Sequence, residues 1–482
     1  MDQLTMLWRV AKKEALSLVR DGRFRFASAV LGILLIVTSV AGYREYQERA
    51  TRQEAFAARE RARWLSQGVT SPHSAAHHGV YAFKSQSPLA VIDQGVDRWA
   101  GSVVLLEAHS QNFLRFRPAE DGAAVRRFGE LSVAAILEVA VPLLIVLLAY
   151  DCFAGERESG TMRLLLSVGV RRRILLAGKA LGVALPLTAV LFPAAGRGTV
   201  ALLWLRPAGT TPNLERIGLI AGGYLLYFCL VLGAVLTISL AARSTRLALV
   251  VSLCFWFWNS VASSQVVTDV ARWISPTPPS LDVAASVTEH IASRPTLWDR
   301  RREVNDRFKR KYGVSSILDL PVNPGGIMQL EQEEDDTRAT SESVGTVYRA
   351  QTRQTSLSRW GGLVAPLLAL QPVTMGLAGT DLYHHHHFAS AAEQYRRNLV
   401  GMLNRASAYD PSVSRRELHP MAEATVSIAG PDLWAKAPSF SYDVPSIAEV
   451  LRYNILTLVL LAVWACALPI LFSVAARRWN PE

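Results

Sequence analysis

Runs of predominantly apolar residues, each close to the length of a membrane span, alternate with charged stretches along most of this 482-residue chain. An α-helix rises about 1.5 Å per residue, so about 20 apolar residues are needed to cross the roughly 30 Å core of a bilayer. The pattern predicts an all-α polytopic membrane protein with six transmembrane helices. The predicted spans are residues 26–43, 131–153, 174–195, 217–242, 247–267 and 453–475.

Two long polar stretches, residues 44–130 and 268–449, follow the first and the fifth predicted span. The four spans between them place both insertions on the same side of the membrane, in the periplasm if the termini are cytoplasmic. Residues 44–64 contain neither proline nor glycine, so we expect the first span to continue as a helix for about 30 Å beyond the membrane. We predict two mainly helical periplasmic insertions.

The second insertion contains several helical patterns separated by Pro and Gly breaks. Helices are predicted there at residues 299–312, 331–359 and 389–408. Residues 363–379 are also apolar, but they contain Pro366 and Pro372. Because two prolines argue against a straight span, we expect this segment to pack at the membrane surface or in a domain core.

The N-terminal 25 residues combine Trp8 and several leucines with basic residues. We interpret residues 1–25 as an amphipathic helix on the cytoplasmic face of the membrane, with a polar lead-in to the first span as the simpler alternative. A cleaved signal peptide is a further alternative, because Ser39, Val40 and Ala41 form a small-residue site. The basic lead-in is long for a signal peptide, and the six-span layout needs this helix.

The net charge of the chain is +11, and half of its residues are hydrophobic. The basic residues cluster beside the apolar runs, as in the cytoplasmic flanks of membrane spans, and this argues against nucleic acid as a partner. The four cysteines lie in apolar runs, so the insertions have no structural disulfide. The layout places both termini in the cytoplasm together with Arg157, Arg163, Arg171, Arg172, Arg173, Arg243, Arg246, Arg477 and Arg478.

Residues 154–173, between the second and third predicted spans, concentrate charge that the flanking segments exclude. The triplet Glu156–Glu158 comes first and a glycine-threonine break follows. Residues 162–168 are long enough for about two helical turns, with Thr161 as N-cap, and three arginines close the segment. A short helix held between two spans, with acids before it and bases after it, is suited to docking a cytosolic partner.

The pattern Glu-Arg-Glu-x-Gly-Thr-x-Arg-Leu-Leu-Leu-Ser from Glu156, followed by arginines and by Gly178-Lys179, resembles the cytoplasmic loop of type 2 ABC exporter permeases. The outer segment Pro72–Gly79 resembles an uncharacterised bacterial branch of that family. The resemblance implies a coupling helix that sits on a separate ABC ATPase subunit, and a second copy of the permease or a related permease. The coupling residues that it implies are Glu156, Arg157, Glu158, Gly160, Thr161, Arg163 and Leu165.

The chain encodes no recognisable nucleotide site. Gly178-Lys179 lacks both the following serine or threonine and the upstream glycine of a phosphate-binding loop. The HExxH helix of zinc proteases and the GxSxG nucleophile elbow are also missing. We therefore expect no catalytic residue and no cofactor in this chain, with ATP bound and hydrolysed on the partner subunit.

Two ionisable residues, Glu138 and Arg197, fall within or next to predicted spans. Charges inside a bilayer are costly and tend to pair or to line a path. The third span would bring Arg197 to the outer level of Glu138, which predicts an ion pair. The alternative is that both side chains lie in the headgroup region.

All ten histidines lie in the two insertions. His73 and His77 are four residues apart, which on a helix places both rings on one face, and residues 384–387 add four consecutive histidines. Neutral imidazole binds zinc, copper and nickel well, so we consider a divalent metal held by His73 or His77 with part of the run 384–387. The alternative is structural hydrogen bonding.

These observations favour the permease subunit of an ABC exporter in a bacterial inner membrane, coupled to ATP hydrolysis by another subunit. The large insertions keep a second interpretation open, a mechanical transducer that acts on a periplasmic partner without transport. A membrane-bound metal-dependent hydrolase is a third, and only the histidines favour it.

Overall fold

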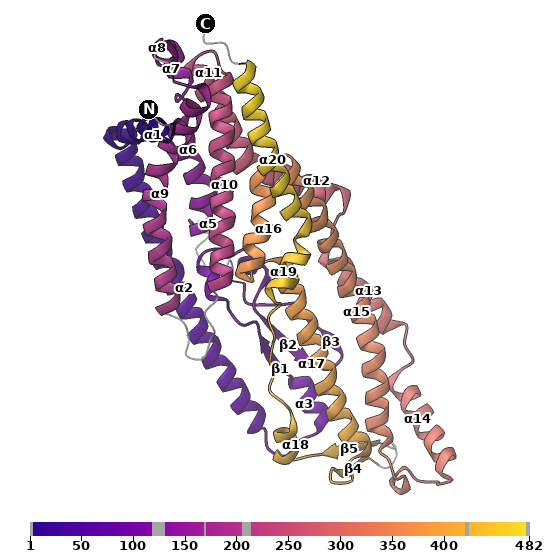
Figure 1. The fold of residues 1–482 in the computed structure, drawn as a ribbon. Coiled ribbons are helices and arrows are strands. Elements are labelled where there is room, and N and C mark those ends of the chain that lie inside the picture. The colour runs from indigo at the N-terminus through magenta and orange to yellow at the C-terminus, as the bar shows by residue number, and fades with distance from the viewer. Residues whose placement is uncertain (1–2, 118–130, 168–169, 205–213, 420–423, 479–482) are drawn as a thin grey trace.

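A computed structural model describes residues 3–117, 131–167, 170–204, 214–419 and 424–478. A bundle of helices carries both ends of the chain, α1 (Gln3–Arg20) and the last turn of α20 (Ile455–Arg478), at the same end (Figure 1). We call this end the terminal end. Most of the two insertions lies beyond the bundle, and we call residues 66–117, 280–359 and 382–446 the distal body.

Among the described residues, six helices are long and apolar enough to cross a membrane, which confirms the six-span prediction. They cover Gly22–Leu65, Val133–Glu158, Arg172–Pro193, Leu214–Ala241, Thr245–Ile274 and Ile455–Arg477.

Two of these spans contain a π-helical turn. The second span consists of α5 (Val133–Ala135), the π-turn Ile136–Ala140 and α6 (Val141–Ala149). The fifth consists of α11 (Thr245–Phe257), the π-turn Trp258–Ala262 and α12 (Ser263–Ile274). A π-turn adds one residue to a helical turn and often marks a functional position.

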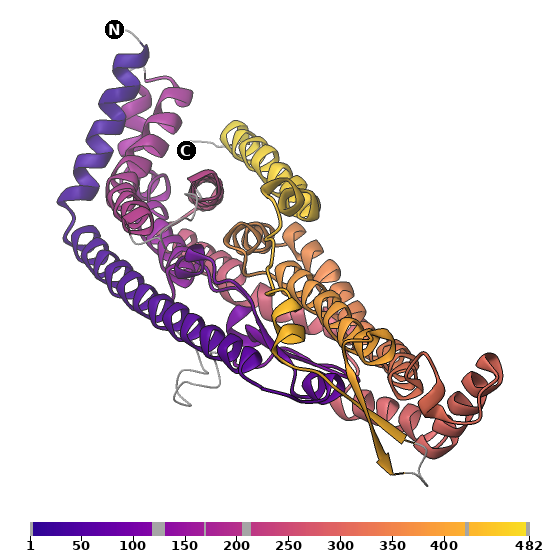
Figure 2. The same ribbon diagram turned by 90° about the horizontal axis from the view of Figure 1, so that it is seen from below.

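The first span is part of one 44-residue helix, α2 (Gly22–Leu65), which is about 66 Å long at 1.5 Å per residue. Its unbroken course to Leu65 confirms the helical continuation expected from the absence of proline and glycine. The helix follows one edge of the molecule from the terminal end into the distal body (Figure 1, Figure 2). There the Trp64 ring packs edge-on against Trp434 of α18 (Pro431–Lys436), and its indole nitrogen donates to the Trp434 carbonyl at 3.0 Å.

The distal body is mostly helical, as predicted, but the first insertion also contains a sheet that the sequence analysis did not predict. Strands β1 (Val80–Phe83), β2 (Val103–Glu107) and β3 (Ser110–Gln111) form an antiparallel sheet in that order. Leu106 of β2 and Ala82 of β1 are buried against α17 (Leu382–Tyr409), which belongs to the second insertion. The sheet is therefore stabilised by residues nearly 300 positions away in the chain.

The second insertion contains the predicted helices. They appear as α14 (Leu297–Tyr312), α15 (Pro324–Arg359) and α17, with α13 (Ser280–Ala292) before them and the hairpin β4 (Ser414–His419) and β5 (Ala424–Ile428) after them. The apolar segment with two prolines forms α16 (Pro366–Ala378), which is too short to span a membrane. It packs against α10 (Leu214–Ala241) and α20 in the core of the molecule.

At the terminal end, α1 lies across the bundle and packs against α9 (Arg172–Trp204) (Figure 1). The contact is close because two glycines of α9 face α1. A Cβ atom at Gly178 would lie 2.7 Å from Val10 Cγ1, and one at Gly182 would lie 2.4 Å from Glu14 Cβ. The Gly178 and Gly182 spacing therefore serves contact with the N-terminal helix.

We predict that Gly182→Ala displaces α1 and lowers the free energy of unfolding by about 1–3 kcal/mol, the usual cost of overpacking. Thermal unfolding of the purified protein in detergent measures the effect. Gly218→Ala in α10 is the matched control, because a Cβ there has no neighbour within 4 Å. Equal unfolding midpoints for the two variants would contradict the close α1–α9 contact.

Candidate functional site

The segment predicted to dock a partner forms two short helices at the terminal end, α7 (Ala154–Glu158) and α8 (Thr161–Ser167) (Figure 1). Gly160 joins them with a φ of +72°, in the left-handed region that glycine adopts without strain. Thr161, predicted as the N-cap, is the first residue of α8, and its hydroxyl lies 2.8 Å from the Ser159 hydroxyl. Residues 168 and 169 lie outside the described residues.

Glu156 of α7 is tied to two other helices through one lysine. The Lys179 ammonium group of α9 lies 2.8 Å from a Glu156 carboxylate oxygen and 3.1 Å from a Glu14 carboxylate oxygen of α1. The Lys179 side chain is only 2% exposed. Lys13 also approaches Glu156, at 3.8 Å, but its side chain is 66% exposed. The buried lysine therefore fastens α7 to both α1 and α9.

The other two charged residues of α7 cap helices of the bundle. Arg157 donates to the carbonyl oxygens of Leu240, at 2.8 Å, and of Ala242, where α10 ends. A cation at a helix C-terminus satisfies free carbonyl groups and opposes the helix dipole favourably.

Glu158 caps the N-terminal end of a helix, at the start of α11. Its carboxylate accepts hydrogen bonds from the Thr245 backbone N–H at 2.9 Å and from the Thr245 hydroxyl at 2.7 Å. A carboxylate at a helix N-terminus satisfies a free N–H group. The triplet Glu156–Glu158 thus anchors α7 to the permease itself.

α8 contributes much of the exposed surface of this region, next to the exposed Glu158. Leu164 is 64% exposed, and Thr161 and Arg163 are exposed as well. Leu165, which the resemblance implies as a coupling residue, has a side chain outside the described residues, so its role stays a prediction. The periodicity of the sequence does not show which of Leu164 and Leu165 faces outward, because the spans on both sides of the segment are apolar as well.

Glu138 lies in the π-turn of the second span and is buried. Its carboxylate accepts hydrogen bonds from Gln371 of α16 at 2.6 Å and from the Tyr224 hydroxyl of α10 at 3.3 Å. Arg197 belongs to α9, but its side chain lies outside the described residues, so its pairing with Glu138 stays a prediction.

Asn259 gives the second π-turn a buried polar contact, since its amide donates to the Tyr227 hydroxyl at 2.8 Å. Both π-turns therefore face α10 with a polar side chain.

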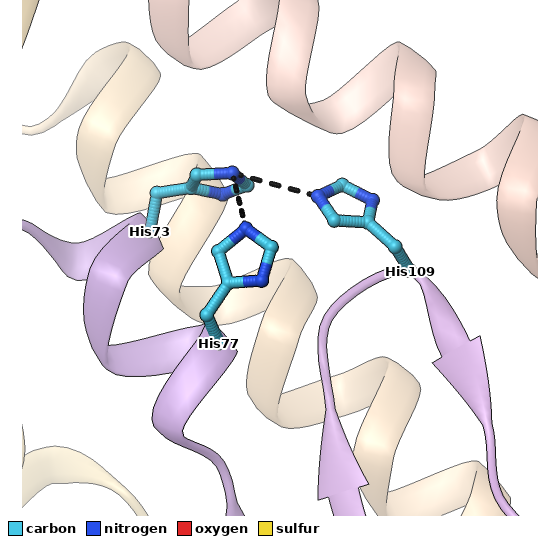
Figure 3. Close-up of side chains that lie close together, drawn as sticks. All are labelled: His73, His77 and His109. Atoms are coloured by element: carbon cyan, nitrogen blue, oxygen red, sulfur yellow. Dashed lines mark hydrogen bonds between the residues drawn. The ribbon is translucent and has the colours of Figure 1, made fainter.

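His73 and His77 come together, and the third ring beside them is His109 (Figure 3). The consecutive histidines of α17 have other partners. His384 lies 2.6 Å from an Asp381 carboxylate oxygen, and His386 lies 2.9 Å from the Gln351 amide oxygen. The expected combination of His73 or His77 with residues 384–387 is replaced by a cluster with His109, which the sequence analysis left among the remaining histidines.

Comparison with known proteins gives two family matches. A family model described as ABC-2 family transporter protein matches residues 8–309, more than half of the chain. A second model, a domain of unknown function termed DUF3526, matches residues 286–443. The chain is also similar to the probable ABC transporter permease protein NosY of Pseudomonas aeruginosa, with 34% identity over 128 residues. That alignment covers 26% of this chain and 46% of the relative, less than half of its length.

We predict that Lys179→Met lowers the free energy of unfolding by about 3–5 kcal/mol, because it leaves two carboxylates without their buried partner. Denaturant or thermal unfolding in detergent measures the loss. Lys13→Met is the control and should change stability by less than about 1 kcal/mol, since its pair is exposed. A loss of similar size in both variants would show that the buried lysine has no special role.

Proposed function

The chain belongs to the ABC-2 family of transporter proteins, and from that premise we propose that it is the permease subunit of an exporter in a bacterial inner membrane. It is a multi-pass membrane protein, and permeases of this family are the non-catalytic membrane subunits of their transporters. ATP hydrolysis therefore belongs to a separate ATPase subunit, and the family match argues against a metal-dependent hydrolase. A second permease, identical or related, completes the proposed assembly.

The proposal rests on the different contacts of α7 and α8. The charged residues of α7 bind other helices of the permease, including the exposed Glu158, whereas α8 presents further exposed side chains at the terminal end. A docking helix needs this combination, because a partner must reach its surface and its base must not move independently. The ATPase would bind α8, and α7 would transmit the displacement.

Two routes lead from α7 into the spans. Glu156 and Lys179 connect it to α1 and α9. Arg157 and Glu158 connect it to the adjoining ends of α10 and α11. A push on α8 therefore reaches the third, fourth and fifth spans at once, and a substrate path between two permeases would change its exposure.

The charge distribution supports a cytoplasmic terminal end. Arg171, Arg172 and Arg173 precede or begin α9, and Arg243 and Arg246 flank the turn from α10 to α11. Arginines beside membrane spans favour the cytoplasmic side. Both termini then lie in the cytoplasm, and the distal body lies in the periplasm.

We predict that a photo-crosslinking amino acid at Leu164 attaches to the ATPase subunit in cells that express both native subunits. The exposed position and the inward anchoring of α7 are the physical reasons. Mass spectrometry of the adduct identifies the partner. Ser85 in the distal body and Leu147 in the second span, both exposed, are the control positions and should give no such adduct. An ATPase adduct at Ser85, or none at Leu164, would contradict the docking site and the orientation.

A mechanical transducer is the second candidate, and α2 is the observation that favours it. One unbroken helix runs from the terminal end to Trp434 in the distal body. A rigid rod of this kind can carry a displacement from the ATPase side to a periplasmic partner.

Pulsed EPR distances on the permease–ATPase complex distinguish the two candidates. We expect a transducer to change the distance between spin labels at Ser85 and Ser293, one in each insertion, when ATP binds. A pair on the spans, at Cys229 and Cys466, is the reference. Movement of the reference pair with an unchanged distal pair would favour transport and exclude the transducer.

A further inference from the structure

Three histidines converge at the junction of the two insertions. His73 and His77 are one turn apart on α3 (Pro72–His78), which begins with the proline at its first position. His109 lies in the turn between β2 and β3. Their rings point at one another, and the His73 Nε2 atom lies 3.2 Å from His77 Nε2 and 3.4 Å from His109 Nε2 (Figure 3).

The outer nitrogens of two rings have partners that set the tautomer. His109 Nδ1 lies 2.8 Å from an Asp336 carboxylate oxygen of α15, so this nitrogen carries the proton that it donates. His73 Nδ1 lies 3.4 Å from the Asn404 amide oxygen of α17, and the Asn404 amide nitrogen donates to the Gln329 carbonyl. With these tautomers, His73 and His109 direct the lone pair of Nε2 into the cluster.

Hydrogen bonds within the protein cannot satisfy all three Nε2 atoms of this cluster. A ring nitrogen has one in-plane position, which holds either a proton or a lone pair. His73 Nε2 faces two other Nε2 atoms and can form a hydrogen bond with only one of them.

A metal ion fits the observed spacing. Two imidazole nitrogens bound at about 2.0–2.1 Å to a tetrahedral zinc ion lie about 3.3–3.4 Å apart. The two distances from His73 Nε2 have nearly these values. Hydrogen bonding of the second ring nitrogen to a carboxylate or amide oxygen is also the usual support for a metal-bound histidine.

We propose that His73, His77 and His109 bind one divalent transition-metal ion of the zinc, copper and nickel class through their Nε2 atoms. The exposed side of His77 leaves a further coordination position open to solvent. Three imidazoles suit this class of ion, whereas calcium and magnesium prefer oxygen ligands. The proposal does not depend on the direction of transport or on the ATPase partner.

The supporting residues come from the other insertion. The His109 backbone N–H donates to a Glu333 carboxylate oxygen at 2.8 Å, which holds His109 in the left-handed conformation at a φ of 65°. Glu333 is held in turn by Arg396 of α17, and Asp336 by Arg294. All three ligands thus belong to the first insertion, and α15 and α17 of the second insertion orient two of them, His109 and His73. A bound ion would link α3 to the β2–β3 turn within the first insertion, on a support that the second insertion supplies.

The test uses the full-length protein in detergent, stripped with a chelator and titrated with Zn²⁺ by calorimetry. We expect one tight site per chain in the wild type and its loss in His77→Ala and in His109→Ala. His77 is exposed, so its replacement should leave the fold intact. Asp336→Asn should weaken binding by about 10- to 100-fold, the usual effect of removing a partner of a metal-bound histidine.

Two controls separate this site from other histidines. His78→Ala changes the neighbouring residue of α3, whose ring contacts the Ser74 carbonyl at 2.7 Å, and it should bind Zn²⁺ as the wild type does. The double variant His386→Ala, His387→Ala should also bind normally. The absorption spectrum of the Co²⁺-loaded protein should show tetrahedral coordination in the wild type and lose it in His77→Ala.

The proposal would be overturned by two results. One is a folded wild-type protein, verified by size-exclusion chromatography and circular dichroism, that binds no Zn²⁺ at micromolar concentration. The other is unchanged binding in both His77→Ala and His109→Ala, which would assign the ion to another group of residues.

Discussion

Lys179 is buried where α1, α7 and α9 meet, between the carboxylates of Glu14 and Glu156. An ammonium group in this position requires both partners, because an unpaired charge in a low-dielectric interior costs several kcal/mol. The three helices are therefore held as one unit, and the glycines of α9 allow α1 to approach closely enough. The proposed docking segment is consequently held at its base, which a helix that transmits force requires.

The distal body depends on contacts between the two insertions in a similar way. The sheet of the first insertion packs on α17 of the second, and the outer end of α2 is held by Trp434. The histidine cluster also combines the two insertions, because Asp336 and Asn404 of the second orient the rings of His109 and His73 in the first. Two hydrophobic clusters and the polar cluster around the histidines thus need residues of both insertions.

The sequence predicts those features that depend on local pattern. Hydropathy identifies the six spans, and the absence of proline and glycine after Gly42 predicts that α2 continues. Features that depend on distant partners could not be predicted. Strands β1 and β2 are short, and their burial requires α17. The acids of α7 were recognised as charges, but their partners, Lys179 and Thr245, are set by how the spans pack. His109 lies next to His73 because the turn between β2 and β3 places it there, and these strands were not predicted.

The order of Glu14, Glu156 and Lys179 along the chain has a consequence for biogenesis. Chains fold from the N-terminus during synthesis, so both carboxylates have left the ribosome before the lysine does. A lone lysine in a span opposes insertion into lipid. Here the third span arrives at a membrane surface that already presents the two counter-charges, so its lysine is neutralised as it enters. The N-terminal helix α1 does not span the membrane. It acquires a fixed position only when α9 has inserted and its two glycines pack against α1.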